Sequence, residues 1–180
     1  MKIVATDGFE FSFEDAIDAF VFDETDKQKQ TFHGAPMKGV DIVAEFETAY
    51  IYIELKNYDD VSIYDDGSAN TGDEKKARDG FKWLKNYLKY KFRDSYLYRH
   101  AENKVEKPIH YICLINFDNA LNLRMQKALK TELPVGKASR RWVHPLATSC
   151  QVVNLKKWND NFPKWPVKQI STVADVTVGA

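Results

Sequence analysis

The chain has 180 residues, 44% of them hydrophobic and 29% charged, a composition typical of one soluble globular domain, here residues 1–180. Its 26 basic and 26 acidic residues cancel, which argues against a protein that coats nucleic acid through net charge alone. No apolar run reaches the ~18 residues of a membrane-spanning helix. Asp7 interrupts the first residues too early for a signal peptide, so we expect a cytoplasmic protein without a membrane partner.

The first predicted element is a helix that begins at Ser12. The run Ser12-Phe13-Glu14-Asp15 resembles a capping box, and apolar residues follow at the spacing of one helical face. After a polar loop over 23–30, two strands are predicted at 40–46 and 50–57. Together they form a hairpin.

A long loop over 59–73 then leads into a helix over 73–98, and a buried strand is predicted at 109–117. Asp118 is typical of the residue that starts the next helix. Strand-like runs at 142–148 and 151–155 precede a tail rich in tryptophan and proline. This order predicts an α/β (α+β) fold, with a central mixed sheet flanked by helices.

The hairpin register follows from alternation, because successive side chains of a strand point to opposite faces. The apolar rows of both strands must reach one core, and this places Ile42 opposite Ile53 and Ala44 opposite Ile51. On the other face, Asp41 then lies directly across from Glu54.

Two acidic residues that face each other across strands have Cβ atoms about 5 Å apart, and their carboxylates repel. The two side chains therefore either point into solvent or hold a cation between them. Their hard oxygen atoms suit Mg²⁺ or Mn²⁺. Lys56 lies two residues beyond Glu54 on the same face, where its ammonium could contact both a scissile phosphate and the attacking water. The alternative is that Glu54 and Lys56 only form the solvated face of an amphipathic strand.

The segment 38–42 followed by 51–57, with Asp41, Glu54 and Lys56 as its signature, resembles the PD-(D/E)XK nuclease superfamily, which has the restriction-endonuclease-like fold. The resemblance implies a core in the order αβββαβ, here with C-terminal additions. It implies that Asp41, Glu54 and the Leu55 carbonyl bind the metal and that Lys56 assists the water. A first-helix glutamate often joins the metal in this superfamily, and Glu14 is the nearest match, with Asp18 as an alternative.

Basic residues recur along one side of the long predicted helix, at the spacing of a single stripe. They are Arg78, Lys82, Lys85, Lys89 and Arg93. This stripe, together with Arg140 and Arg141 in a later loop, is our candidate surface for the phosphate backbone. The alternative is an ordinary solvated face. Trp83, Tyr87 and Tyr90 could stack on bases, although we expect such aromatic side chains to be buried.

Two further features complete the expectations. Cys113 and Cys150 lie in apolar runs without zinc-site spacing, which predicts two buried thiols. None of the four histidines has metal-site spacing, although His33 and His144 could approach the site. We therefore expect a metal-dependent endo- or exonuclease that acts on DNA rather than RNA and that can form a homodimer. The competing hypothesis is an inactive nucleic-acid-binding or protein-interaction domain on the same fold.

Overall fold

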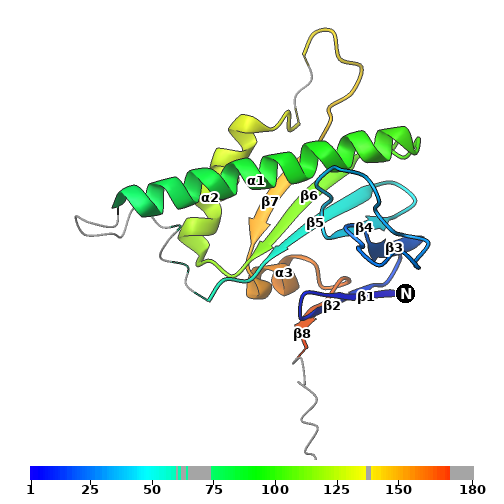
Figure 1. Cartoon of the computed structure of the whole chain (residues 1–180), viewed down its shortest axis with the longest axis horizontal. Helices are drawn as coiled ribbons and strands as arrows, with labels where there is room; N and C mark the ends of the chain where they lie inside the picture. Colours follow the sequence, from blue (N-terminus) through cyan, green and yellow to red (C-terminus); the bar gives the residue numbers. More distant parts are fainter. Residues whose placement is uncertain (60, 62–63, 65–73, 137–138, 171–180) are drawn as a thin grey trace, which may run out of the picture.

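Two β-sheets and three helices make up the part of the chain that the computed structural model describes (Figure 1). That part comprises residues 1–59, 61, 64, 74–136 and 139–170, with the backbone alone for 74–78. The predicted mixture of helices and sheet is confirmed. The predicted loop over 59–73 falls almost wholly outside the described residues.

The larger sheet has five strands in the order β3-β4-β5-β6-β7. The strands are β3 (Asp18–Val21), β4 (Ile42–Glu45), β5 (Tyr50–Lys56), β6 (Ile109–Ile115) and β7 (Ser149–Val153). The β3–β4 and β4–β5 pairs are antiparallel, whereas β5–β6 and β6–β7 are parallel. Each parallel pair needs a long crossover, which α1 (Glu74–Ala101) and α2 (Asn119–Glu132) supply. The sheet is therefore mixed, as predicted.

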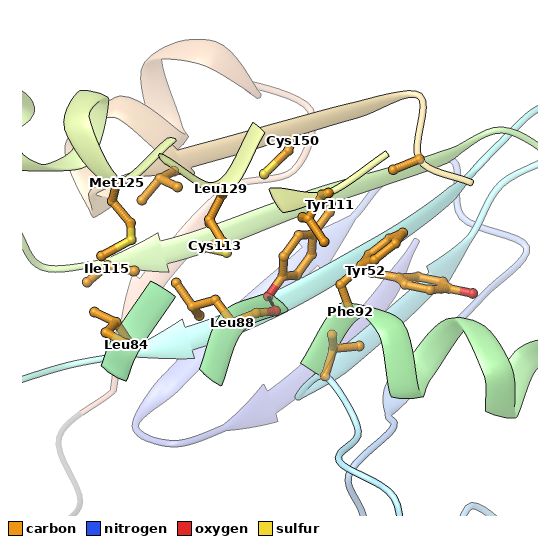
Figure 2. Close-up of a cluster of buried hydrophobic side chains, with 14 of the residues drawn as sticks. Tyr52, Leu84, Leu88, Phe92, Tyr111, Cys113, Ile115, Met125, Leu129 and Cys150 are labelled. Carbon is orange, nitrogen blue, oxygen red and sulfur yellow. Dashed lines mark hydrogen bonds between the residues drawn. The ribbon is translucent and has the colours of Figure 1, made fainter. Parts of the chain in front are cut away.

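Helices α1 and α2 cover one face of this sheet, and a buried cluster fills the space between them (Figure 2). Leu84, Leu88 and Phe92 of α1 pack there against Tyr52 and Tyr111 of the sheet. Cys113 and Cys150 are buried free thiols in the same cluster, which confirms that prediction. Asp118 caps α2 by accepting a hydrogen bond from Leu121 N at 2.8 Å, also as predicted.

The opposite face is covered by the second sheet and a short helix rather than by long helices (Figure 1). These elements are β1 (Lys2–Thr6), β2 (Phe9–Phe13), β8 (Val167–Gln169) and α3 (Leu155–Asn161). Phe11, Phe13 and Trp158 pack against Ile53 and Ile112 of the large sheet. The tryptophan-rich tail therefore closes the second core of the protein itself.

The helix predicted from Ser12 is wrong. The chain forms β2 up to Phe13 and begins β3 at Asp18 instead. Phe9, Phe11 and Phe13 are buried and alternate with polar residues, a period of two that fits a half-buried strand. Pairing with β8 supplies the neighbour that this strand needs. Tertiary pairing therefore overrides the local capping pattern.

The strand predicted at 142–148 is also wrong, because the chain there is irregular. Pro145 cannot donate a ladder hydrogen bond, and Val143 is 96% exposed. In the described residues, this segment forms one isolated bridge, between Val135 and Ala147, and a backbone hydrogen bond from Thr148 N to the Ile109 carbonyl. The strand predicted at 151–155 is confirmed as β7, displaced towards its N-terminal side. No described helix has the length and apolarity to cross a membrane.

Gly39 leads into the β4–β5 hairpin at a point where the backbone passes close to two aromatic rings. A Cβ atom added there would lie 3.1 Å from Phe22 and 3.1 Å from His33. Both rings are buried and cannot turn away easily. We therefore expect Gly39→Ala to lower the free energy of unfolding by about 1–3 kcal/mol, measured by urea denaturation. An unchanged midpoint would show that the rings have room to move.

Candidate active site

The β4–β5 hairpin brings Asp41 and Glu54 together in the register that the sequence predicted. Ile42 pairs with Ile53 and Ala44 pairs with Ile51. Asp41 stands one residue before β4, and its Oδ2 accepts a hydrogen bond from Leu55 N at 2.6 Å. The Asp41 side chain thus extends the ladder at the point where the backbone pairing ends.

Helix α1 holds the start of this hairpin in place. Lys38 N donates to Asp94 Oδ2 at 3.0 Å, and Val40 N donates to Ser95 Oγ at 2.8 Å. These bonds fix the backbone on the N-terminal side of Asp41. Because Asp94 and Ser95 lie on a long helix packed on the sheet, the carboxylate rests on rigid elements rather than on a loop.

Three oxygen atoms converge on the ammonium group of Lys56. Lys56 Nζ lies 2.6 Å from Glu54 Oε1 and 3.9 Å from Asp41 Oδ2. It also donates a hydrogen bond to the Leu55 carbonyl at 2.6 Å. These are the three groups that the resemblance to the PD-(D/E)XK superfamily implies as metal ligands. The arrangement therefore presents a small cradle of oxygens with a positive charge inside it.

A second lysine, Lys91 of α1, neutralises the other side of the same pair. Its Nζ lies 3.5 Å from Asp41 Oδ1, 3.6 Å from Glu54 Oε2 and 2.9 Å from Asp23 Oδ2. The Lys91 side chain is only 5% exposed. Sequence reasoning missed this residue, although Leu84, Leu88 and Lys91 follow one another at helical spacing. A lysine on the apolar stripe of a helix is the signal that would have found it.

Burial rather than solvation governs the charge of this cluster. Glu54 is 0% exposed, so the alternative of a solvated strand face is wrong for this residue. Burial and the adjacent Asp41 carboxylate raise the pKa of Glu54 to about 8, against the pull of Lys56 and Lys91. Burial also raises the pKa of Asp41, while the two lysines oppose the shift.

The two lysines stay charged. Burial alone would lower the pKa of Lys56, but the charges of Glu54 and Asp41 outweigh it and raise the pKa. The same two carboxylates raise the pKa of Lys91, again against its burial, with help from the hydrogen bond to Asp23. The cluster consequently contains two ammonium groups facing two carboxyl groups in a largely dry site.

The cradle fits a hard divalent cation by the chemistry of its donors. Both Glu54 oxygens are buried, and neither accepts a well-formed hydrogen bond from the described residues. No group of three or more His, Cys, Asp or Glu side chains converges anywhere in the described part of the chain. An ion here would therefore rest on two carboxylates and a carbonyl, with water and phosphate oxygens around it, as Mg²⁺ prefers.

The structure does not bring Glu14 or Asp18 into this cluster. Glu14 is exposed after β2, in contact with the tail through a backbone hydrogen bond to Lys164. Asp18 pairs with Glu45, at the far end of β4 from Asp41. Because the predicted first helix is absent, the carboxylate that approaches the site is instead Asp23, through Lys91.

Most of the predicted basic stripe faces helix α2. Lys85 and Lys89 donate to the Glu132 carboxylate at 2.7 Å and 3.0 Å, and Arg93 donates to the Glu132 carbonyl. A phosphate backbone would have to compete with Glu132 for these groups. Lys82 is exposed, and the side chain of Arg78 lies outside the described residues.

Arg140 and Arg141 are exposed, but they lie at the other end of the sheet. Their loop joins the strands where Thr148 N donates to the Ile109 carbonyl, whereas Lys56 pairs with Ile115 at the opposite end of β6. Six residues of strand separate these ends, about 20 Å. The two arginines therefore do not share one surface patch with Lys56.

The histidines also stay outside the cluster. His33 stacks on Tyr98 and forms a hydrogen bond with the Met37 carbonyl, and His110 bonds Ser149 Oγ. His144 is exposed in the same loop as Arg141. A cavity of about 580 Å³ lies between α1, α2 and this loop, with Trp142 and Leu146 in its wall. Neither Asp41 nor Glu54 lines this cavity.

The expectation that the aromatic residues of α1 are buried is wrong for two of them. Trp83 is 55% exposed and Tyr90 is 48% exposed. Tyr87 is half-buried, and its ring lies 4.9 Å from Lys38 Nζ and 5.3 Å from Lys56 Nζ. The long helix therefore presents aromatic surface directly beside the cradle.

Comparison with known proteins adds no further constraint on these assignments. No protein-family model, curated protein or solved structure matches this chain.

Proposed function

We propose that this chain is a metal-dependent nuclease of the PD-(D/E)XK superfamily, which hydrolyses phosphodiester bonds of nucleic acid, DNA rather than RNA. The observation that carries the proposal is the convergence of Asp41 Oδ2, Glu54 Oε1 and the Leu55 carbonyl on one point that already holds a positive charge. Buried carboxylates are kept together in proteins where a cation compensates them.

The order of elements supports the same proposal. Strands β3, β4 and β5 are followed by α1 and β6, and the restriction-endonuclease-like core has three strands, a helix and a strand in this order. The helix that this core places first is missing from the described residues. The site also lies at the carboxyl end of β5 beside a parallel neighbour, where open α/β sheets bind ligands.

Each residue of the cluster has a role in this proposal. Asp41, Glu54 and the Leu55 carbonyl would hold Mg²⁺ or Mn²⁺, which when bound polarises a phosphoryl oxygen and lowers the pKa of a water molecule. Lys56 sits on a flexible stem with 20% of its side chain exposed, so its ammonium can leave the oxygens and reach the scissile phosphate. There it offsets the charge gained in the transition state. Lys91 keeps the carboxylates compensated from the far side.

One observation favours a second candidate, an inactive domain on the same fold. Lys56 and Lys91 already pair with Asp41 and with the Glu54 carboxyl group without any metal, so the cluster is also a self-sufficient buried ion network. In this candidate, nucleic acid or a protein partner binds elsewhere and no cleavage occurs. Calorimetric titration with Mn²⁺ distinguishes the two candidates. The nuclease is expected to bind the ion, and the inactive domain is not.

The test of the nuclease is cleavage of circular single-stranded DNA, plasmid DNA and RNA, with Mg²⁺ or Mn²⁺ and with chelator. We expect cleavage by the parent chain that needs the metal. Asp41→Asn and Lys56→Met should each reduce the rate by about 100-fold or more, since each removes a charge that acts on the transition state. Asn retains an oxygen that can accept from Leu55 N, so this variant is expected to fold.

The matched control is Lys107→Met. Lys107 has the same 20% side-chain exposure as Lys56 and also pairs with a carboxylate, Glu45, but at the other end of the hairpin. Its variant should cleave like the parent. A parent chain that leaves all three substrates intact with either metal would refute the nuclease and favour the inactive domain.

A further inference from the structure

A pair of aromatic side chains, an exposed tryptophan and a half-buried tyrosine, stands on α1 next to the cradle. Trp83 and Tyr87 lie one helical turn apart with their rings stacked, the centroids 5.2 Å apart and the planes 19° from parallel. Aromatic bodies of this size are usually buried, yet 55% of Trp83 is exposed. Because Tyr87 covers one face of the indole, the surface that Trp83 offers to solvent is the remaining face and its edges.

Tyr87 connects this platform to the candidate active site. The ammonium groups of Lys38, Lys56 and Lys91 lie 4.9, 5.3 and 5.6 Å from its ring centroid. The Tyr87 ring therefore separates Lys56, the residue assigned to the scissile phosphate, from the exposed indole of Trp83. A base that stacks on Trp83 therefore lies across the Tyr87 ring from the phosphate that Lys56 would contact, and a strand that reaches both would pass along Tyr87.

The charges around the platform suit a phosphodiester chain. Lys38 and Lys82 are both exposed. The Lys38 ammonium lies over the Tyr87 ring, whereas the Lys82 side chain leaves the helix about 100° away from Trp83 and extends the basic surface to one side of it. Positive groups interleaved with stacking aromatics are the combination that binds single-stranded nucleic acid, where cations follow the backbone and rings take the bases. In a duplex the bases stack on each other, so their faces are not available to a tryptophan.

We propose that Trp83, backed by Tyr87, is a stacking platform for an unpaired base, and that the substrate of this site is single-stranded nucleic acid. The proposal rests on the proposed function for the role of Lys56. It adds a substrate class that the two carboxylates and the lysine cannot define, since those groups act on any phosphodiester. Trp83 is thus a specificity residue rather than a catalytic one.

Fluorescence anisotropy with a labelled oligodeoxythymidine, an oligouridine and a duplex of the same length tests the platform. The titrations are made in chelator at low salt, so binding is measured without cleavage. We expect the parent to bind a single strand more tightly than the duplex. Trp83→Ala should weaken single-strand binding about tenfold, the effect of losing one stacked base, and Trp83→Phe should restore much of it.

The matched control is Tyr90→Ala, which removes another exposed aromatic from the same helix, at a position where Lys89 rather than Lys56 lies over the ring. This variant should bind like the parent. Weaker binding of either oligonucleotide by Trp83→Ala alone supports the platform, and the oligonucleotide bound more tightly identifies the sugar of the substrate.

Equal binding by Trp83→Ala and the parent, equal affinity for strand and duplex, or no binding of a single strand at all would overturn the platform. These outcomes are independent of cleavage. If the parent cuts DNA and the Trp83→Ala variant binds single strands as tightly as the parent, only the stacking platform is refuted. If the parent binds single strands through Trp83 but does not cut them, only the nuclease is refuted.

Discussion

Replacing Lys91 by methionine is expected to lower the free energy of unfolding of the metal-free protein by about 3 kcal/mol at neutral pH. The ammonium is 5% exposed and lies within 3.6 Å of oxygens from both Asp41 and Glu54. Methionine has a similar length, so the change removes a buried charge more than it removes volume. Urea denaturation in the presence of chelator measures the effect.

A divalent ion should reverse much of this loss. If the cradle binds Mn²⁺, the ion supplies the positive charge that the variant lacks and stabilises the folded state by linkage. The matched control is Lys89→Met, two residues earlier on the same helix, where the partly exposed pair with Glu132 contributes at most about 1 kcal/mol. Equal stability of the two variants would show that Lys91 does not compensate the carboxylates.

The second large effect is a dependence of stability on pH that originates at Glu54. Its pKa is raised from 4.5 to about 8 by burial and by Asp41, so the folded state holds a proton that the unfolded state releases. Stability from this group is therefore fully present below pH 4.5 and is lost as the pH rises through 8. A shift of the pKa from 4.5 to about 8 corresponds to a full change of about 5 kcal/mol.

Glu54→Gln isolates this contribution, because glutamine keeps the size of the side chain and does not titrate. The free energy of unfolding of parent and variant is measured by denaturation at pH 5 and pH 8.5 in chelator. Between these pH values the parent should lose stability relative to the variant. A difference that stays constant with pH would mean that Glu54 is ionised throughout, with Lys56 and Lys91 outweighing its burial.

The hairpin was predictable because two constraints act on it at once. Alternation in both strands and the need of two apolar rows for one core leave a single register, and the observed pairing of Ile42 with Ile53 follows it. The convergence of Asp41 and Glu54 is a geometric consequence of that register. Pattern alone therefore placed the two acids on neighbouring strands.

The burial of the site was not predictable from the same pattern. Alternation in β5 suggested one apolar and one polar face, yet Tyr50, Tyr52 and Glu54 are all buried under α1. What covers a strand is decided by the packing of a helix that comes later in the chain. Lys91, which belongs to that helix, was overlooked because charged residues on helices are usually on the solvated face.

The N-terminal region shows the limit of local signals. A capping pattern at Ser12 and the alternation of Phe9, Phe11 and Phe13 give opposite predictions for overlapping residues. The strand prevails because β8, more than 150 residues later in the chain, pairs with β2, and Trp158 packs edge-on against Phe11. Such a distant neighbour leaves no trace in the residues around Ser12.

The metal site is tested most directly by a crystal structure of the parent chain soaked with Mn²⁺, with anomalous scattering used to locate the ion. We expect one Mn²⁺ bound by Asp41, Glu54 and the Leu55 carbonyl. The Lys56 ammonium should move away from that carbonyl, which it contacts at 2.6 Å without the ion. Crystals that show no manganese there at saturating concentration, with Lys56 unmoved, would contradict this expectation.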